Sequence, residues 1–408
     1  MKILFLSQWY PYPPNNGSKI RIYNLLRGLS RDHGISLLSF IDPLDRRAAD
    51  DPLKDLCSDV NTAVWKPFNP NSLRSITGFF NSEPRSVMDI YSREMANKIQ
   101  NQVLRHQYDL VVASQITMAG YAECFRGIPA VWDEVETGVF YQQVSRATPF
   151  FKHLRSSLTW AKHRSYLSRL VHSFQACTVA SEVEKGLLHR IAPDYGNIEV
   201  IPNFIEAGNY EADRLSAKPV PFSMIFCGSF RYRVNYEAAA WFLKEAYPVI
   251  QASFPEARLT ITGDTAGLPL PPAANVDTPG YIEDIRPFVA NSWVSIAPIL
   301  VGGGTRLKIL EAMALGTPVV STAKGAEGLD VIPGEHLLIG DTPEDFADAV
   351  VRLFGDPLLR QKLAANAHQL VKRNYDSGAV LPKFQSLIWK AASHREIGQM
   401  AAQGADDR

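Results

Sequence analysis

A glycine-rich segment at residues 302–308 runs into basic residues, and this combination suits a negatively charged ligand. Glycines let backbone N–H groups approach a ligand closely, and the N-terminus of a following helix carries partial positive charge. Arg306 and Lys308 lie in the first turn of that predicted helix, where cations are unfavourable for the helix itself. A bound phosphate would offset this cost. The expected ligand contacts come from Gly302, Gly303, Gly304, Thr305, Arg306 and Lys308.

The residues that follow, from Glu311 to Pro318, shape the rest of this segment. Small residues after Glu311 would let the helix lie close to a sheet, and Gly316 with Pro318 would end it before a Val-Val strand. Three consecutive glycines alone would indicate only a strand-to-helix turn with solvated basic residues. Together with the cations, the glutamate and the helix stop, they favour a functional site.

Short apolar runs alternate with helical patterns in the first half of the chain. The predicted strands cover residues 2–7, 35–40, 110–113, 130–133, 176–179 and 199–201. The predicted helices cover residues 20–31, 88–106, 150–172 and 182–191. This alternation implies crossover units and a parallel sheet covered on both faces.

A second alternating series follows a stretch that is rich in Asn, Gly, Pro and charge. Its predicted strands cover residues 222–227, 258–262, 293–297 and 318–321. Its predicted helices cover residues 236–254, 306–315, 344–354, 357–371 and 378–392. We therefore expect an α/β protein of two doubly wound, Rossmann-like domains facing a cleft, with ligands at the carboxyl ends of the strands.

The expected domain boundaries follow from these two series. We expect an N-terminal domain (residues 1–202), a linker (203–221), a C-terminal domain (222–375), a helix crossing back to the first domain (376–392) and a frayed polar tail (393–408). The resemblance described below implies that the first domain binds the acceptor and the second binds the nucleotide sugar.

Bulk composition narrows the class of protein. The formal net charge of the 408 residues is zero, so nothing points to nucleic acid as a partner. The four cysteines have no metal-type spacing, which indicates buried, reduced thiols and a cytoplasmic compartment. No stretch approaches the roughly 20 apolar residues of a spanning helix, and the first apolar run reads as a strand rather than a signal peptide. Any membrane contact would then be peripheral.

The run from Glu311, Glu-Ala-Met-Ala-Leu-Gly-Thr-Pro-Val-Val, resembles the donor-binding signature of retaining glycosyltransferase family 4, which has the GT-B fold. The resemblance implies that Glu311 accepts hydrogen bonds from the ribose hydroxyls of a nucleotide donor, a role that suits the two oxygens of a carboxylate. The first glutamate of the signature is replaced by Gly303, which places the chain in a subgroup with a GGGTRLK motif. That replacement leaves the identity of the sugar open.

The resemblance implies further donor contacts. The loop after Gly228 resembles the one that carries diphosphate-binding cations, but Ser229 and Val234 stand at the usual cationic positions, so Arg231 becomes the substitute. By the same resemblance, the backbone of Tyr281 and Ile282 would cradle the nucleobase.

In the first domain, the loop after the first strand resembles the family's glycine loop, with Asn16 and Gly17 in place of two glycines. Arg21 is the usual basic residue of the following helix and would contact the donor phosphate or the acceptor. Asp133 and Glu134, after another strand, would bind acceptor hydroxyls, or alternatively begin a helix as its N-cap and first-turn charge.

The resemblance implies transfer of a hexose from a UDP- or GDP-linked sugar to a saccharide or lipid-linked acceptor, with retention of configuration, in cell-surface polysaccharide or glycolipid synthesis. Arg306, Lys308 and Arg231 would neutralise the leaving diphosphate, so we expect neither a metal nor a cofactor. Two alternatives remain open: a nucleotide-sugar epimerase of GT-B architecture, and a non-catalytic sugar-nucleotide binding protein.

A basic, aromatic-studded segment at residues 146–181 carries six Lys or Arg residues and no Asp or Glu. Such a helix can lie on an anionic membrane surface. An ordinary helix covering a sheet has the same composition, so both interpretations stay open here.

Overall fold

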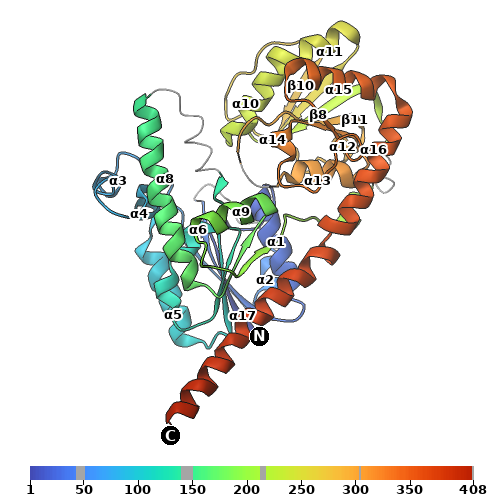
Figure 1. Ribbon diagram of the computed structural model, residues 1–408. Helices are drawn as coiled ribbons and strands as arrows, with labels where there is room; N and C mark the ends of the chain where they lie inside the picture. Colours follow the sequence, from blue (N-terminus) through green and yellow to red (C-terminus); the bar gives the residue numbers. More distant parts are fainter. Residues whose placement is uncertain (43–50, 139–149, 212–216, 303–304, 407–408) are drawn as a thin grey trace. The chain divides into compact units, whose positions relative to one another are not determined.

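The computed structural model describes residues 1–42, 51–138, 150–211, 217–302 and 305–406 (Figure 1). The chain divides into two compact units. The first is formed by residues 1–202 together with 381–408, and the second by residues 203–380. Residues 203–221, predicted as a linker, therefore belong to the second unit.

The first unit is built on a 7-stranded sheet in the order β3-β2-β1-β4-β5-β6-β7, in which every neighbouring pair is parallel. Its strands are β1 (Lys2–Ser7), β2 (Gly34–Ile41), β3 (Asp59–Val64), β4 (Leu110–Ser114), β5 (Ala130–Asp133), β6 (Ala176–Val179) and β7 (Ile198–Val200). The central strands are continuous apolar runs because both faces of the sheet are covered. Strand order reverses between β1 and β4.

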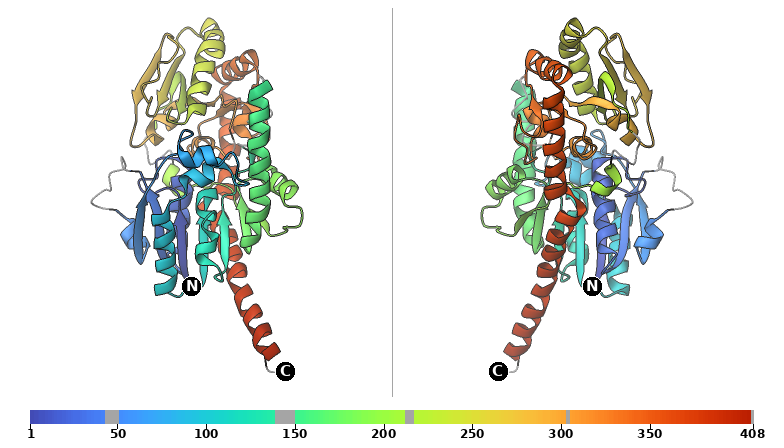
Figure 2. Two further views of the ribbon diagram at one scale, coloured as in Figure 1. Left: turned by 90° about the vertical axis from the view of Figure 1, so that its left-hand side faces the viewer. Right: turned by 90° about the vertical axis from the view of Figure 1, so that its right-hand side faces the viewer.

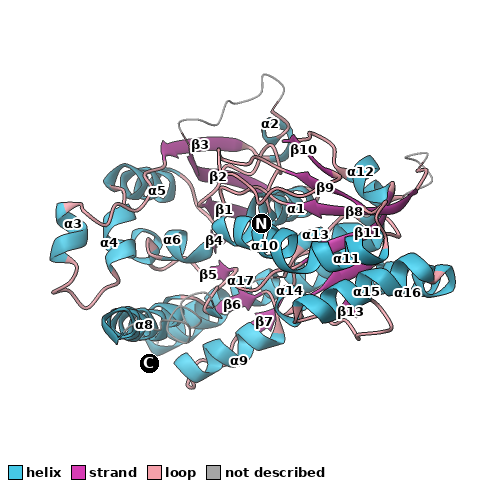
Figure 3. Cartoon of the chain, turned by 90° about the horizontal axis from the view of Figure 1, so that it is seen from above, coloured by secondary structure: helices cyan, strands magenta, loops and turns pink. Residues whose placement is uncertain are grey.

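Helices cover both faces of this sheet (Figure 3). The helices of the unit are α1 (Gly17–Leu29), α2 (Leu53–Leu56), α3 (Leu73–Thr77), α4 (Arg85–Ile90), α5 (Arg93–Arg105), α6 (Gln115–Ala119), α8 (Phe150–Leu170), α9 (Glu182–Ile191) and the part of α17 (Ser377–Asp406) from Leu381 onward, with 3-10 turns η1 (Ala122–Phe125) and η2 (Val171–Ser173). α1 and α17 pack closely, since a Cβ on Gly28 would lie 2.5 Å from Leu381 Cδ1. The last turns of α17 project away from the sheet (Figure 2).

The second unit has a 6-stranded sheet in the order β10-β9-β8-β11-β12-β13, again parallel throughout. Its strands are β8 (Val220–Cys227), β9 (Arg258–Thr262), β10 (Val276–Gly280), β11 (Ser292–Ala297), β12 (Val319–Ser321) and β13 (Leu338–Ile339). Its helical segments are η3 (Ala207–Tyr210), α10 (Arg233–Trp241), η5 (Phe242–Ala246), α11 (Tyr247–Ser253), α12 (Arg286–Ala290), α13 (Leu307–Ala314), α14 (Ala323–Ala326), α15 (Pro343–Gly355), α16 (Pro357–Leu370) and η6 (Val371–Tyr375). Strand order reverses between β8 and β11.

The expected fold class, an α/β protein with two doubly wound parallel sheets, is confirmed. Three strands were not predicted. β3 has a polar sequence, β10 contains a proline, and β13 has only two residues, so none shows the apolar run of a buried strand.

Some predicted helix boundaries are corrected by the structure. The helix predicted over 88–106 is two helices, because Ser92 caps the N-terminus of α5 by accepting a hydrogen bond from the backbone N–H of Met95. The helix predicted over 236–254 is interrupted by the π-helical segment η5. The tail predicted to fray from residue 393 continues α17 as far as Asp406.

Candidate functional site

The glycine-rich segment leaves the second sheet at the point where its strand order reverses. Gly228 follows β8 directly, and Gly302 lies between β11 and α13. Doubly wound sheets bind ligands beyond the carboxyl ends of their strands at this point. Gly303 and Gly304, which the sequence also predicts as ligand contacts, lie outside the described residues.

Two glycines allow polar side chains to crowd this edge of the sheet. A Cβ on Gly228 would lie 2.7 Å from Asn235 Nδ2 and 2.9 Å from Lys308 Nζ. Gly302 has a φ of +97°, and a Cβ there would lie 2.8 Å from the hydroxyl oxygen of Tyr232. The backbone conformation of Gly302 therefore requires glycine, and a side chain at Gly228 would displace the ends of Asn235 and Lys308. The loop after β8 lies against the first turn of α13.

Arg306 occupies the N-cap position of α13 and lies next to this glycine segment. Its Nη2 donates a hydrogen bond to the carbonyl oxygen of Val301 at 3.2 Å. Its Nε atom is buried and has no hydrogen-bond partner among the described residues. A buried guanidinium N–H without an acceptor costs free energy. An oxygen of a ligand bound at the glycine segment would satisfy it.

Lys308 lies two residues further, in the first turn of α13. Its ammonium group donates a hydrogen bond to Asn235 Oδ1 at 3.0 Å and lies 4.4 Å from the centre of the Phe226 ring. Burial lowers the pKa of Lys308 to about 7, and the positive charge of Arg306 adds to this shift. A negatively charged ligand would raise the pKa again and favour the charged form. Lys308 is thus suited to respond to a bound phosphate.

Glu311 lies one turn after Lys308 on the same face of α13. Its Oε1 accepts a hydrogen bond from the hydroxyl of Tyr210 at 2.9 Å. Burial raises the pKa of Glu311, while this hydrogen bond and the charges of Lys308 and Arg286 oppose the rise. A carboxylate offers about four lone-pair sites, so the bond from Tyr210 leaves sites for a ribose diol.

Tyr210 and Arg286 are contributors that the sequence did not single out. Tyr210 ends η3, within the predicted linker, and orients the carboxylate of Glu311. Arg286 begins α12, donates to the carbonyl oxygen of Asn209 at 2.8 Å and pairs through two hydrogen bonds with Asp284. Arg286 therefore ties η3 to α12. No local sequence signal marks either residue, because their positions near Glu311 depend on tertiary folding.

Arg231 is placed differently from the other predicted cations. Its side chain is exposed and forms an ion pair with Asp264, which lies just after the end of β9. Thr305 is buried, where its Oγ1 accepts from the backbone N–H of Asn203 and its carbonyl oxygen accepts from Asn203 Nδ2, both at 3.3 Å. These two hydrogen bonds fix the start of α13.

Ile282, predicted to lie at the nucleobase, is half-buried and follows β10.

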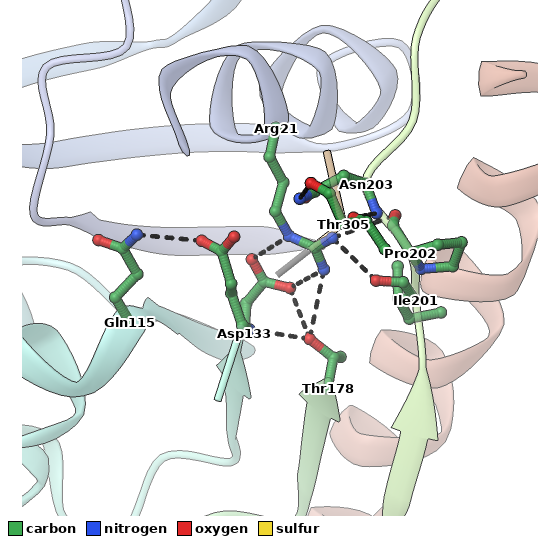
Figure 4. A network of polar contacts seen from close by, with 9 residues as sticks. Arg21, Gln115, Asp133, Thr178, Ile201, Pro202, Asn203 and Thr305 are labelled. Atoms are coloured by element: carbon green, nitrogen blue, oxygen red, sulfur yellow. Dashed lines mark hydrogen bonds and ion pairs between the residues drawn. The ribbon is translucent and has the colours of Figure 1, made fainter. Parts of the chain in front are cut away.

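In the first unit, the predicted site residues before Glu134 are Asn16, Gly17, Arg21 and Asp133. Asn16 is the N-cap of α1 and accepts a hydrogen bond from the backbone N–H of Lys19, and Gly17 begins the helix. Arg21 and Asp133 form an ion pair of 2.7 Å in which neither side chain is exposed to solvent (Figure 4). We expected Arg21 and Asp133 to contact donor or acceptor directly, whereas the structure shows the two side chains enclosed and paired with each other. Asn16 and Gly17 are exposed, and their predicted contact with a ligand stays a prediction.

The Arg21 guanidinium links several elements of the first unit (Figure 4). Nη1 donates to the carbonyl oxygens of Ile201 and Pro202, at 2.8 and 3.1 Å. Nη2 and the hydroxyl of Thr178 both bond to Asp133 Oδ1. Although burial lowers the pKa of Arg21, the charge and hydrogen bonds of Asp133 and the nearby acidic residues Glu134 and Glu136 together outweigh it and raise the pKa. The pair therefore joins α1, β5, β6 and the chain after β7.

Glu134 follows Asp133 in the sequence and lies beside this network. It has an unusual backbone conformation and a carboxyl group with a raised pKa. Glu134 and Gln115 follow β5 and β4 and have φ values of 60° and 67°, a region that non-glycine residues rarely adopt. Gln115 Nε2 donates to Glu134 Oε2 at 3.0 Å and to Ser18 Oγ at 2.9 Å. Burial raises the pKa of Glu134 to about 8, so its carboxyl group holds a proton at neutral pH.

The raised pKa of Glu134 predicts a pH-dependent stability. Between about pH 4.3, where an unfolded glutamate ionises, and about pH 8, the folded chain keeps a proton that the unfolded chain has lost, so stability falls as pH rises. Glu134→Gln should remove this loss. We expect the free energy of unfolding of the variant, relative to the wild type, to rise by about 2–4 kcal/mol between about pH 5 and about pH 8.

Denaturant unfolding at several pH values measures this difference. Glu123→Gln, at an exposed position of the same unit, is the matched control and should follow the wild type. Equal pH slopes for Glu134→Gln and the wild type would show that Glu134 ionises normally.

The sequence is similar to known proteins in the region of this site and over most of the chain. Residues 221–356, all within the second unit, match the family model of the glycosyl transferases group 1. The chain is also 23% identical over 398 residues to an uncharacterized 44.6 kDa protein in the cps region of Klebsiella pneumoniae, covering 93% of this chain and 97% of that relative.

Solved structures show the same fold over nearly the whole chain. Sucrose-phosphate synthase from Thermosynechococcus elongatus matches with a TM-score of 0.67 and 18% identity, covering 96% of this chain and 99% of that chain. Anabaena HepE in complex with UDP-glucose matches with a TM-score of 0.65 and 14% identity, covering 96% and 100%. A putative UDP-N-acetylglucosamine 2-epimerase from Listeria monocytogenes matches with a TM-score of 0.54 and 14% identity, covering 94% of each chain.

The protein therefore has the GT-B fold. The group 1 match over the second unit supports a nucleotide-sugar glycosyltransferase. The fold by itself does not separate sugar transfer from epimerisation, because the neighbours include proteins of both kinds. The residues of the site, and not the fold, therefore indicate which reaction is catalysed.

Proposed function

We propose that the protein transfers a hexose from a UDP- or GDP-linked donor to an acceptor hydroxyl, with retention of configuration. The observation that carries the proposal is the arrangement on α13, where Arg306 is the N-cap, Lys308 lies in the first turn and Glu311 lies one turn later. A nucleotide diphosphate presents a ribose diol and an adjacent anionic diphosphate. The carboxylate suits the diol, and the two cations suit the diphosphate.

The proposed chemistry depends on charge that develops on the leaving group. When the anomeric C–O bond breaks, the nucleoside diphosphate gains negative charge, and preorganised cations lower the barrier. Lys308 and Arg306 would supply this stabilisation without a metal, and Arg231 would assist from the loop after β8. As the family 4 resemblance implies, an oxygen of the leaving phosphate takes the proton of the acceptor hydroxyl. No protein nucleophile is then needed.

The wider role follows from the relatives. HepE has been solved with UDP and with UDP-glucose, which supports a uridine nucleotide as the first donor to test. The relative in a cps region supports a role in the synthesis of cell-surface polysaccharide. The acceptor is then a saccharide or a lipid-linked saccharide, met in the cytoplasm at an anionic membrane surface. None of the described helices is long and apolar enough to cross a bilayer.

Incubation with a panel of UDP- and GDP-sugars, with and without saccharide and lipid-linked acceptors, tests the proposal. We expect one donor to be consumed, nucleoside diphosphate to be released faster when acceptor is present, and the product to keep the anomeric configuration of the donor by NMR. Inversion of configuration would contradict the retaining mechanism.

The same experiment separates the two alternative functions. An epimerase would produce an isomer of the donor without any acceptor. A non-catalytic binding protein would bind the nucleotide and leave every donor intact. Either result would replace the proposed transfer.

A further inference from the structure

A pair of short helices in the first unit exposes apolar side chains to an unusual degree. We call residues 68–91, which include α3 and α4, the α3–α4 hairpin. Phe80 is 94% exposed and Leu73 is 82% exposed. The other exposed apolar residues of the hairpin are Phe68, Ile76, Phe79 and Tyr91. α4 contributes no buried residue and α3 contributes only Ser75, so the apolar side chains face outward.

Arg85 and Asp89 form hydrogen bonds within the hairpin. Arg85 Nε and Nη2 donate to the carbonyl oxygens of Ser75 and Pro70, at 2.6 and 2.8 Å. The Asp89 carboxylate accepts from the backbone N–H of Asn69 at 2.7 Å and from the hydroxyl of Ser72. These hydrogen bonds hold the segment before α3 and the end of α3 against α4.

The exposed surface of the hairpin is amphipathic, since Leu73 and Phe80 lie beside exposed polar residues such as Arg74 and Asn81. Such a surface suits the boundary between lipid headgroups and acyl chains.

The hairpin lies against α8, the basic helix that the sequence also singled out (Figures 1 and 3). Lys162 Nζ donates to the carbonyl oxygens of Gly78 and Phe79, at 3.1 and 2.8 Å. Leu158, one turn before Lys162, and Leu154, one turn earlier, are both exposed. The exposed apolar surface therefore continues from the hairpin onto α8.

Charge around this surface is strongly positive. Residues 68–91 and 150–181 contain seven Lys or Arg and two Asp or Glu, a net charge of +5, although the whole chain is neutral. Both acidic residues belong to the hairpin, and one of them, Asp89, is held by its internal hydrogen bonds. The basic residues therefore complement an anionic surface.

We propose that the α3–α4 hairpin inserts Leu73, Ile76 and Phe80 into the headgroup region of an anionic phospholipid bilayer, with α8 lying along it. In proteins that bind anionic membranes, apolar side chains are buried about 5–10 Å deep in the bilayer. The Lys and Arg residues that flank them attract the anionic lipid headgroups. This membrane surface rests on the proposed function in one respect: it is where a lipid-linked acceptor would be met.

A lipid surface fits these features better than a protein partner does. A stable protein interface buries about 1,200–2,000 Å² between complementary surfaces with a packed apolar core. The two most exposed side chains here instead project singly, Leu73 from the start of α3 and Phe80 from the turn after it. Projecting apolar side chains with a basic surround need no matching shape in a bilayer.

Vesicle co-sedimentation of the full-length protein tests the proposal. Wild type should bind vesicles of phosphatidylglycerol with phosphatidylcholine, and not vesicles of phosphatidylcholine alone. The double variant Leu73→Glu/Phe80→Glu should bind the anionic vesicles at least about tenfold more weakly. The matched control is Leu104→Glu/Leu358→Glu, at positions 83% and 77% exposed on α5 and α16. It adds the same charge and should bind within about twofold of wild type.

Three outcomes would overturn the proposal: no binding of wild type to anionic vesicles, equal loss in the control variant, or a wild-type dimer that the hairpin variant dissociates while vesicle binding is unchanged. Nucleotide affinity, measured without lipid, should be the same in both variants and wild type. A wild type that binds nucleotide but no anionic vesicles rejects only the membrane surface. Absent nucleotide binding with intact vesicle binding rejects only the proposed transfer.

Discussion

Replacing Lys308 with methionine is expected to lower the turnover number for sugar transfer by about 100- to 1,000-fold. Lys308 has the positive charge that lies within the first turn of α13, and its polar contact is the uncharged Asn235 side chain. Its charge is thus available for the leaving diphosphate. Methionine keeps the length of the side chain and removes the charge.

Steady-state kinetics with the identified donor and acceptor measure the effect. Lys244→Met is the matched control, because Lys244 is an exposed lysine of the same unit that pairs with Glu245. The control should retain the wild-type turnover number. A turnover number for Lys308→Met within about threefold of wild type would remove Lys308 from the mechanism.

The lowered pKa of Lys308 also sets the pH dependence of nucleotide binding. Above about pH 7 the free site holds a neutral Lys308, and binding a diphosphate must then take up a proton. The dissociation constant of the nucleoside diphosphate should therefore rise with pH, by up to about tenfold per unit. The Lys308→Met variant should bind more weakly and lack this rise. A parallel slope in the variant would assign the titration to another group.

Removing the carboxylate of Asp133 is expected to destabilise the first unit by about 3–5 kcal/mol. Asp133→Ala would leave the fully buried Arg21 guanidinium without its counter-charge and without two hydrogen bonds. A buried, unpaired charge is far more costly than the pair itself. Hydrogen exchange at the amides of β5 and β6, which the pair joins, measures the loss.

An exposed ion pair in the same unit provides the comparison. Glu123→Ala breaks the pair of Glu123 with Arg126, whose side chains are 78% and 82% exposed, and should cost less than about 1 kcal/mol. Arg21→Met added to Asp133→Ala should restore part of the protection, since it removes the unpaired charge. Equal effects of Asp133→Ala and Glu123→Ala would contradict a structural role for the buried pair.

The sequence predicted the fold well where apolar runs are strong. β5, β6, α9 and β9 have the predicted bounds, because buried parallel strands and a Ser-capped helix have clear local signals. The position of Glu311 on a helix after a glycine-rich turn was also predicted, since the helix stop and the small residues are local features.

Other features depend on contacts between distant residues. Arg21 was predicted to contact a ligand, but its enclosure could not be predicted, because it depends on the approach of β5, β6 and the chain after β7. Tyr210 reads as part of a linker, yet it bonds to Glu311 across 101 residues of sequence. The positive φ values of Gln115 and Glu134 leave no mark on the sequence, because neither residue type requires them.

The central claim, a nucleotide-diphosphate site on α13, is tested most directly by calorimetric titration of the full-length protein with UDP and GDP. We predict saturable binding of at least one of them, and an affinity about 30-fold or more lower in Glu311→Ala, because the ribose diol would lose its carboxylate acceptor. Full affinity in Glu311→Ala, or no binding of either nucleotide to the wild type, would contradict the account.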